Sequence, residues 1–256
     1  MKGEKAMNSK ELYAYLNDYL EINSIPDYRG AFNGLQTEGG SEVVKVAVAV
    51  DACIATFEQA VSAKANLLIV HHGLFWGVKA PITGAYYRRL SLLLRNDLAL
   101  YSCHLPLDVH LEVGNNHVLA KMLNLEATGT FYEFEGTPIG ISAYTRHTRG
   151  GFMELVRSAL GVEPKVLATG PKDVRKVGIM TGGGGSAIGA AARAGVDTLL
   201  TGEGNHHTYF EAEEHGINVI YAGHYATETL GVRALAKHLE GRFGLETLFI
   251  DHPTGL

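Results

Sequence analysis

The sequence predicts an α/β fold made of two α/β halves with mixed, largely parallel sheets. Short apolar runs rich in β-branched residues alternate with segments of helical periodicity along most of the chain. These runs are continuous rather than alternating in polarity, which is typical of strands that helices cover on both faces. The alternation starts twice, on either side of residues 125–150. We therefore expect an N-terminal half at residues 1–127 and a C-terminal half at residues 128–256, with the last helix able to pack back on the first half.

The first half is expected to begin with a helix over residues 9–20, because Asn8 and Glu11 have the spacing of a capping box and apolar residues follow at helical intervals. Residues 22–40 are rich in turn-forming types and predict a loop, in which residues 33–36 could present polar side chains to a site. The next strands are predicted at 43–50, 67–70 and 98–102, and the helices at 56–65, 86–95 and 115–123.

The second half is expected to open with an antiparallel strand at 137–145, followed by a helix that starts at Gly150 and ends near Gly161. A regular alternation of short strands and helices then resumes. The strands are predicted at 177–180, 198–200, 219–221 and 247–250, and the helices at 186–194, 207–215 and 227–239.

Composition and charge argue against several classes of protein. With 46% hydrophobic residues, the chain can bury a substantial core. The net charge of -5 and the scattered Lys and Arg residues argue against a nucleic-acid partner. No apolar run of the sequence approaches the ~18 residues of a membrane span, and residues 1–10 lack the apolar core of a signal peptide, so we expect a cytoplasmic protein with no membrane partner. Cys53 and Cys103 are expected to be buried structural thiols.

Five of the predicted strands end on segments rich in functional residue types. In open α/β sheets, ligands bind beyond the carboxyl ends of the strands, where loops and helix amino termini gather. The five segments here are residues 71–73, 104–108, 182–185, 201–203 and 224–228.

His71 and His72 are adjacent, and adjacent residues of a strand point to opposite faces. Both can face one site where the strand gives way to a loop, which Gly73 permits, or each can serve a different metal ion. The alternative is that they are hydrogen-bonded core histidines, which is the commoner role of a histidine behind an apolar strand.

Two further pairs combine a histidine with an acidic residue four positions later. His104 and Asp108 flank a rigid Leu-Pro-Leu segment, and a carboxylate there could bridge two cations or simply cap a turn. His224 and Glu228 project from one helix face, as two ligands of one site require. The helix dipole explains Glu228 alone but does not explain His224.

The glycine run at residues 182–185 lies between a predicted strand and a helix amino terminus. Backbone N–H groups there can approach an anion, so Gly183, Gly184 and Ser186 are candidates for binding a phosphate or carboxylate of the substrate. A flexible turn with a helix cap explains the run equally well. Glu203, on the next loop, is a candidate acid or base.

Together these segments offer imidazole and carboxylate groups and no thiolate. That ligand set suits one or two divalent ions such as zinc, manganese or iron. A metal-dependent hydrolase is therefore the leading hypothesis from the residues alone.

Four of the segments resemble motifs of the Nif-three-like dinuclear-metal-centre proteins, a family also called type 2 GTP cyclohydrolase I. They are Leu-Ile-Val-His71-His72-Gly, His104-Leu-Pro-Leu-Asp108-Val-His, Thr201-Gly-Glu203 and Gly223-His224-Tyr-Ala-Thr-Glu228, in the order found in that family. The resemblance runs from about residue 33 to residue 239.

The resemblance implies that two metal ions are bound by His71, His72, Asp108, His224 and Glu228. It places His104 near the metals, behind them or facing the substrate. It also implies two α/β halves with the metal site in the cleft between them, and a toroidal homohexamer. The span from Thr130 to Lys176 is too short for the inserted domain that some relatives carry.

The resulting hypothesis is a hydrolase in which two divalent ions, bridged by Asp108 or Glu228, lower the pKa of a water molecule that attacks a small substrate. If the substrate is GTP, as the family name suggests, the attack falls on C8 of the purine, and His104 or Glu203 relays protons. Two alternatives stay open: a non-catalytic metal-binding or regulatory scaffold, and a phosphoesterase.

Overall fold

A computed structural model describes residues 5–77 and 80–255, and it divides the chain into two compact units. The first unit comprises Met1–Leu107 and Gly231–His252, and the second comprises Asp108–Leu230 and Pro253–Leu256. Relative to the expected halves, residues 108–127 lie in the second unit and residues 231–252 in the first. Two of the three boundaries fall within helices, α4 (Leu105–Val109) and α9 (His224–Phe243), and the third follows His252.

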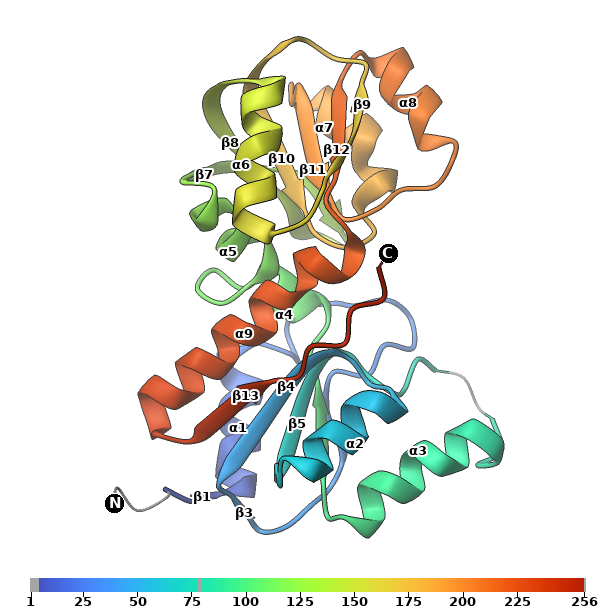
Figure 1. The fold of residues 1–256 in the computed structure, drawn as a ribbon, viewed down its shortest axis with the longest axis vertical. Helices are drawn as coiled ribbons and strands as arrows, with labels where there is room; N and C mark the ends of the chain where they lie inside the picture. The colour runs from blue at the N-terminus through green and yellow to red at the C-terminus, as the bar shows by residue number, and fades with distance from the viewer. Residues whose placement is uncertain (1–4, 78–79, 256) are drawn as a thin grey trace. The chain divides into compact units, whose positions relative to one another are not determined.

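The first unit contains a five-stranded sheet in the order β13-β4-β5-β6-β2, of which β13, β4 and β5 are labelled in Figure 1. The first four strands of this order are parallel, and β2 pairs with β6 antiparallel. The strands are β2 (Gly34–Thr37), β4 (Lys45–Asp51), β5 (Leu67–His72), β6 (Ala99–Ser102) and β13 (Glu246–Phe249). A separate small sheet joins β1 (Met7–Asn8) to β3 (Glu42–Val43) antiparallel.

Helices cover both faces of the five-stranded sheet. α2 (Ile54–Ser62) and α3 (Gly84–Arg95) contribute Phe57 and Leu93 to a buried apolar cluster on one face. On the other face, the hydroxyl of Tyr101 in β6 donates a hydrogen bond to Asn17 of α1 (Ser9–Tyr19), with an oxygen–oxygen distance of 2.9 Å. The continuous burial of residues 46–50 in β4 follows from this double coverage.

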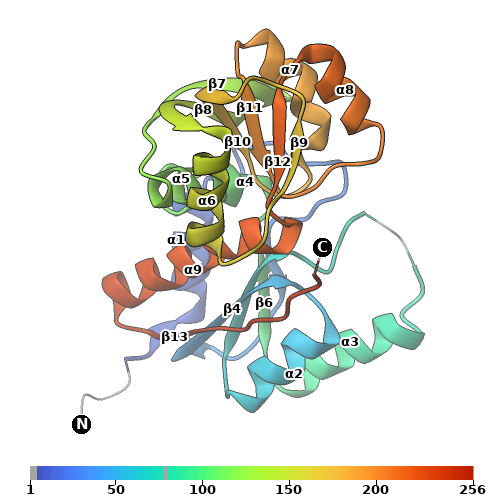
Figure 2. The ribbon, with the colours of Figure 1, turned by 45° about the horizontal axis from the view of Figure 1, so that its top comes forward.

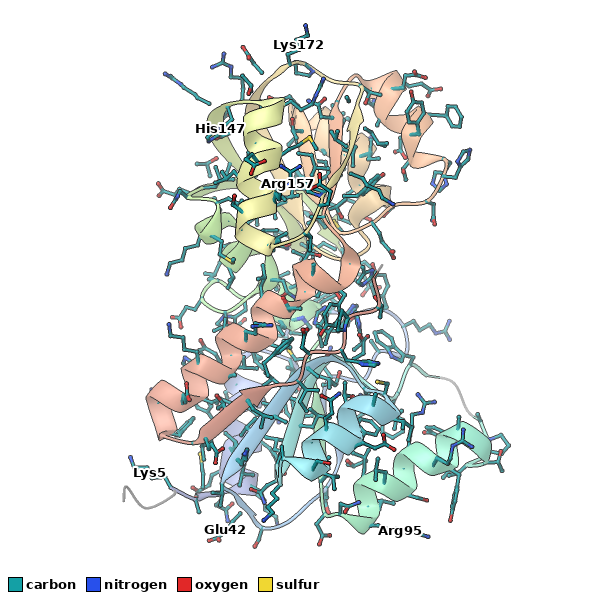
Figure 3. The ribbon with its side chains drawn as sticks, viewed as in Figure 1. Lys5, Glu42, Arg95, His147, Arg157 and Lys172 are labelled. Atoms are coloured by element: carbon teal, nitrogen blue, oxygen red, sulfur yellow. The ribbon has the colours of Figure 1, made fainter. Side chains whose placement is uncertain are left out.

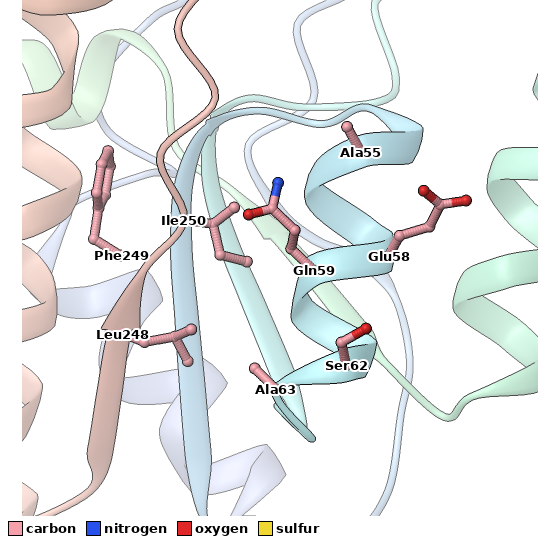
Figure 4. A pocket seen from close by; sticks show the side chains of 8 residues that line it. All are labelled: Ala55, Glu58, Gln59, Ser62, Ala63, Leu248, Phe249 and Ile250. Atoms are coloured by element: carbon pink, nitrogen blue, oxygen red, sulfur yellow. The ribbon is translucent and has the colours of Figure 1, made fainter.

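The side chains of the edge strand β13 and of the residue after it alternate between the two faces of the sheet. Leu248 and Ile250 point toward α2, whereas Phe249 points away and lies under the guanidinium of Arg233 in α9, 3.7 Å from its ring centroid (Figure 4). A cavity of about 520 Å³ lies next to α2 and β13. In the described part of the chain, its lining residues are Ala55, Glu58, Gln59, Ser62, Ala63, Leu248, Phe249 and Ile250. None of the residues predicted to form the site is among them.

The second unit contains a six-stranded sheet in the order β7-β8-β10-β11-β12-β9. β10, β11 and β12 are parallel, and the remaining strands pair antiparallel with their neighbours. The strands are β7 (Ala127–Phe134), β8 (Thr137–Thr148), β9 (Lys165–Ala168), β10 (Asp173–Met180), β11 (Thr198–Thr201) and β12 (Asn218–Tyr221).

Helices also cover both faces of this second sheet (Figure 2). α5 (Asn115–Met122) and α6 (Arg149–Leu160) bury Leu119 and Phe152 on one face. The 3-10 turn η1 (Gly184–Ala187), α7 (Ile188–Arg193) and α8 (Thr208–His215) bury Ile188 and Ala212 on the other. Arg157 of α6, labelled in Figure 3, pairs with Glu163 beyond the helix end.

The predicted α/β class with mixed sheets is confirmed, but the two-residue β1 and three strands of the two large sheets lie where the sequence predicts none. The expectation of a loop throughout residues 22–40 is wrong for β2, and β7 and β9 are not predicted at all. All three are edge strands. Their residues are largely exposed or half-buried, so they lack the continuous apolar runs by which the central strands are recognised.

Among the helices that the structure describes, none is both long and apolar enough to cross a membrane. Residues 1–4, on which part of the expectation about the amino terminus rests, lie outside the described residues.

Candidate functional site

The histidines of the first unit gather at the carboxyl ends of β5 and β6. His71 and His72 are the last residues of β5, and His104 lies just beyond the end of β6. Each offers a ring nitrogen, and these nitrogens lie within 4.8 Å of one another. The ring centroids are 4.7 Å, 5.0 Å and 5.6 Å apart. We call this group the imidazole cluster (His71, His72 and His104), and it forms because parallel strands end at the same edge of a sheet.

Gly73 lets the chain leave β5 directly after the two histidines. A Cβ at this position would collide with Gln36 Nε2 and would lie 2.5 Å from Ser102 Oγ. Gln36 holds the departing loop, because its Oε1 accepts a hydrogen bond from the backbone N–H of Leu74 at 2.7 Å. Gln36, one of the polar residues at 33–36, thus supports the site by holding the loop that follows the two histidines.

Each ring of the imidazole cluster is oriented through its Nδ1 atom by an oxygen. The Nδ1–oxygen pairs are His71 with the Cys103 carbonyl at 3.0 Å, His72 with Asp51 Oδ1 at 2.8 Å, and His104 with Asp27 Oδ1 at 2.8 Å. Because a carbonyl or carboxylate oxygen accepts, the proton of each neutral ring is on Nδ1 and the lone pair is on Nε2. Metal-binding histidines are held in this way, so the donor chemistry of the cluster fits a divalent metal ion.

Asp27 connects His104 to the loop that precedes β2. Its Oδ2 accepts hydrogen bonds from the Leu105 N–H at 3.0 Å and from Asn33 Nδ2 at 2.8 Å. Asn33 Oδ1 in turn accepts the N–H of His104 at 2.8 Å. Burial alone would raise the pKa of Asp27, but its hydrogen bond and charge interaction with His104 and the bonds from Asn33 and the Tyr28 backbone lower that pKa. Asp27 therefore stays a carboxylate that fixes His104.

A second group of functional side chains lies in the second unit, around the carboxyl ends of β10, β11 and β12. We call it the carboxylate cluster (Asp108, Glu203, His224 and Glu228). His224 and Glu228 occupy the first turns of α9, Glu203 follows β11, and Asp108 belongs to α4. Gly223, with φ of 90°, gives the chain the left-handed residue that it needs between β12 and α9.

His224 lies between two carboxylates of this cluster. Its Nε2 is 3.1 Å from Glu228 Oε2, and its Nδ1 is 2.9 Å from Glu203 Oε1. The hydrogen bond to Glu228 raises the pKa of His224 to about 9 against the opposing effect of burial, and Glu203 adds to the rise. Because metal ligands must be deprotonated, a cation held by Nε2 would have to displace the proton that His224 shares with Glu228.

Glu228 is almost fully buried, with 4% of its side chain exposed, against the backbone of Gly182. A Cβ on Gly182, whose φ is 65°, would collide with Glu228 Oε1. The carbonyl of Gly182 accepts hydrogen bonds from the N–H groups of Gly202 at 2.9 Å and Glu203 at 3.0 Å. Its N–H donates to Thr227 Oγ1 at 3.0 Å. This glycine thus fixes the loop of Glu203 and the helix of Glu228 against the end of β10.

Asp108 is also buried at the end of β10. Its Oδ1 accepts hydrogen bonds from Asn115 Nδ2 at 2.8 Å and from the hydroxyl of Thr181 at 3.4 Å. Asn116 Oδ1 holds the same threonine, accepting its N–H at 2.9 Å. Asp108 and Glu228 therefore contact consecutive residues, Thr181 and Gly182.

A family model described as Duf34/NIF3 (NGG1p interacting factor 3) matches residues 7–255. The chain belongs to this family. The resemblance inferred from the four sequence motifs is thereby confirmed.

Curated relatives and a solved structure match nearly the whole NIF3-family chain. A protein of Deinococcus radiodurans named GTP cyclohydrolase 1 type 2 homolog is 40% identical, over 99% of this chain and 97% of its own. A Pyrococcus abyssi protein with the same name is 43% identical, over 98% of this chain and 100% of its own. The crystal structure of TTHA1606 from Thermus thermophilus is 44% identical and has a TM-score of 0.89, covering 98% of this chain and 100% of its own.

The predicted site residues of this NIF3-family chain thus fall into two groups, one in each unit. The predicted ligands His71 and His72 lie with His104, whose Nε2 is oriented like theirs, so His104 is a candidate ligand as well as a candidate proton relay. The predicted ligands Asp108, His224 and Glu228 lie with Glu203 in the second unit. The metal-binding and catalytic roles of these residues stay predictions.

The glycine run is explained largely by close packing. The N–H of Gly184 donates to Thr201 Oγ1 at 2.9 Å, and a Cβ on Gly184 would lie 2.5 Å from the same oxygen. A Cβ on Gly185 would lie 2.7 Å from the Cα of Gly204. Gly183 and Ser186 are exposed, so the predicted anion contact stays a prediction for these two, whereas the N–H of Gly184 is already engaged.

Sequence reasoning missed the residues that orient the ligands. Asp51 ends β4, so the rule that singled out five other strand ends applies to it equally. Asp27 carried only the signal of a turn-forming residue, because its partner His104 lies 77 positions away. Asn115 and Thr181, which hold Asp108, gave no signal of their own.

Proposed function

We propose that this protein is a metal-dependent hydrolase of a small substrate, with zinc, iron or manganese held by the imidazole and carboxylate clusters. The observation that carries the proposal is a group of three histidines whose ligand nitrogens lie within 4.8 Å of one another, each ring being oriented through Nδ1 by an oxygen. Structural metal sites usually employ cysteine, so a thiolate-free donor set favours a catalytic role.

His71, His72 and His104 would supply nitrogen ligands, and Asp108, His224 and Glu228 would supply the carboxylates and a further nitrogen. This mixture suits borderline divalent ions. A bound ion of this kind lowers the pKa of water and polarises an electrophile, which is the chemistry that hydrolysis needs.

The remaining residues would position ligands and move protons. Asp27 holds a proton on His104 Nδ1, and Asp51 does the same for His72. Glu203 is half exposed, so it can exchange a proton with solvent while it orients His224 through Nδ1. Gly183 and Ser186 would receive an anionic group of the substrate.

We propose GTP or a related nucleotide as the substrate, because curated relatives about 40% identical over their full length are named GTP cyclohydrolase 1 type 2 homolog. Hydrolysis would then open the purine at C8. We also propose that the chain assembles as a homohexamer, as the family resemblance implies.

The first experiment measures metal content and turnover in the same preparations. Protein purified without added metal is subjected to elemental analysis, and the loaded protein is screened against nucleotides and phosphoesters. We expect bound divalent metal and turnover of a nucleotide by the wild type, and loss of both in Asp108→Asn, which removes the charge but keeps an oxygen for Asn115. The exposed Asp173→Asn, in the same unit, is the control.

The outcomes separate the hypotheses. Nucleotide turnover that persists in Asp108→Asn would contradict the assigned site. Bound metal with no turnover of any compound would support the scaffold alternative, and turnover confined to phosphoesters would support the phosphoesterase alternative.

A further inference from the structure

Two partly exposed aromatic rings flank the imidazole cluster. Tyr28 is 48% exposed and Trp76 is 38% exposed, although large aromatic side chains are normally buried. The ring centroid of Tyr28 lies 5.7 Å from that of His104. The ring centroid of Trp76 lies 5.1 Å from that of His104 and 6.2 Å from that of His72. Both rings therefore border the nitrogen donors and keep part of their surface open to a ligand.

The loops that carry these rings are held in place. The backbone N–H of Tyr28 donates to Asp27 Oδ1 at 2.7 Å, so the carboxylate that orients His104 also positions Tyr28. The indole N–H of Trp76 donates to the carbonyl of Gly73 at 2.8 Å. An antiparallel bridge joins Trp76 to Ala31, on the loop of Tyr28.

Gly30 makes this contact between the loops possible. A Cβ at this position would lie 2.7 Å from the carbonyl oxygen of Trp76, and the φ of Gly30 is 101°. The two rings are thus presented by one joined surface rather than by two independent loops.

Rigid aromatic rings with an open face bind planar ring systems by stacking, at little entropic cost. They also attract cations. A divalent ion on the neighbouring imidazole cluster would repel a cationic ligand, however, so the charge of the site favours a planar ring without a positive charge.

We propose that Tyr28 and Trp76 form a stacking site for a planar heteroaromatic ring, such as a nucleobase, and that this site positions the substrate beside the imidazole cluster. The inference rests on the proposed function for its catalytic meaning, but the stacking itself is measured by binding alone.

Trp76 is the single tryptophan of the chain, so its fluorescence reports directly on this site. The intact protein is titrated with guanosine and, separately, with ribose 5-phosphate, and absorbance by guanosine is corrected with a free tryptophan derivative. We expect guanosine to change the fluorescence saturably and ribose 5-phosphate to leave it unchanged. A guanosine titration with no saturable change would overturn the proposal.

Substitution then separates stacking from other roles of the rings. Tyr28→Leu should weaken guanosine binding about tenfold, within the range of one base–aromatic stack, and Tyr28→Phe should restore it. Trp76→Leu, followed by equilibrium dialysis with guanosine, should give a similar loss. Tyr144→Leu is the matched control, because Tyr144 is 66% exposed and lies on β8 of the other unit.

The proposal fails if Tyr28→Leu binds guanosine as the wild type does. It also fails if guanosine binding is unchanged and the variant alters only the oligomeric mass measured by light scattering. Failure of the proposed function is a different result. Guanosine binding that needs Tyr28, in a protein that hydrolyses no compound, would retain the stacking site and reject the hydrolase. Nucleotide turnover with an unchanged KM in Tyr28→Leu would retain the hydrolase and reject the stacking site.

Discussion

The two units build their clusters on the same chain arrangement. In the first unit, β4, β5 and β6 are parallel and the earlier strand β2 lies antiparallel beside the third of them. In the second unit, β10, β11 and β12 are parallel and the earlier strand β9 lies antiparallel beside the third. In each unit, the chain therefore forms one antiparallel edge strand and then three parallel strands. The large sheet is completed by β13 in the first unit and by β7 and β8 in the second.

The corresponding third strands lead to corresponding residues. His104 follows β6 and His224 follows β12, and an acidic residue lies four positions after each, at Asp108 and Glu228. Both histidines are held through Nδ1 by a carboxylate, Asp27 in one unit and Glu203 in the other. Each unit thus has, after its third parallel strand, a histidine that a carboxylate orients through Nδ1.

The units differ at their first and second parallel strands. In the first unit these strands end at Asp51 and at His71-His72, and in the second they are followed by Gly182 and Glu203. One unit therefore gathers imidazole nitrogens and the other gathers carboxylate oxygens. Nitrogen donors favour zinc and iron more than oxygen donors do, so the two clusters should differ in metal preference although their frameworks agree.

Loss of a metal ligand should have the largest effect on metal affinity in either cluster. His72→Ala should reduce zinc affinity more than about 100-fold, because removing a ligand costs more than removing its hydrogen-bond partner. Glu228→Gln should reduce manganese affinity more than zinc affinity if the clusters differ as proposed. Equilibrium dialysis with each metal measures both, with the exposed His147→Ala as the control (Figure 3). Equal losses for the two metals in both variants would show that the clusters do not differ in preference.

Removal of the orienting carboxylates should have the next largest effect. Asp27→Asn and Glu203→Gln should each lower metal affinity by about 10- to 100-fold, as loss of such partners generally does. The side chain of Asp27 is 5% exposed and that of Glu203 is 51% exposed, so the loss should be greater for Asp27. Isothermal titration with zinc tests this order, and the reverse order would mean that burial does not set the strength of the orienting bond.

The contribution of Gly182, which follows the first parallel strand of the second unit, can be tested by measuring stability. Gly182→Ala should lower the free energy of unfolding by about 2–4 kcal/mol, because it adds both backbone strain and a collision with Glu228. Gly136→Ala is the control, since Gly136 also has positive φ but has no atom within 4 Å of its Cβ position among the described residues. Its loss should be about 1 kcal/mol. Denaturant unfolding measures both, and equal losses would exclude the collision.

The smallest effects should come from single tyrosine hydroxyls in the two units. Tyr15→Phe removes a hydrogen bond to His238 Nε2 at 2.5 Å, and Tyr221→Phe removes one to the Thr208 hydroxyl at 2.6 Å. Each should lower the free energy of unfolding by about 1 kcal/mol. Thermal unfolding of both variants checks this. A loss of free energy several times larger in one variant would show that its tyrosine belongs to a larger hydrogen-bond network.

The parts of the molecule that sequence could predict are those with a local pattern. The buried strand at Leu67–His72 is a continuous apolar run, and the histidines that end it mark the sheet edge. The repeated spacing of His104 with Asp108 and of His224 with Glu228 is also visible in the sequence, and it corresponds to the shared arrangement of the two units. Edge strands such as β9 lacked that pattern, because only their inner side is covered.

Long-range hydrogen bonds had no such local trace. Asp27 orients His104 across 77 positions of the sequence. Thr201, at the end of β11, accepts a hydrogen bond from the N–H of Gly184 in η1. A turn-forming aspartate and a flexible glycine are the interpretations that the neighbouring residues alone support. The pairing of these groups depends on the register of the sheet, which single residues do not encode.

His71 depends on a main-chain acceptor, the carbonyl of Cys103, whereas His72 and His104 depend on side chains. No exchange of one amino acid at position 103 deletes that oxygen, so the orientation of His71 is buffered against mutation. Single substitutions can therefore remove the hydrogen-bond acceptors of His72 and His104. The acceptor of His71 is lost only if the backbone around position 103 changes its conformation.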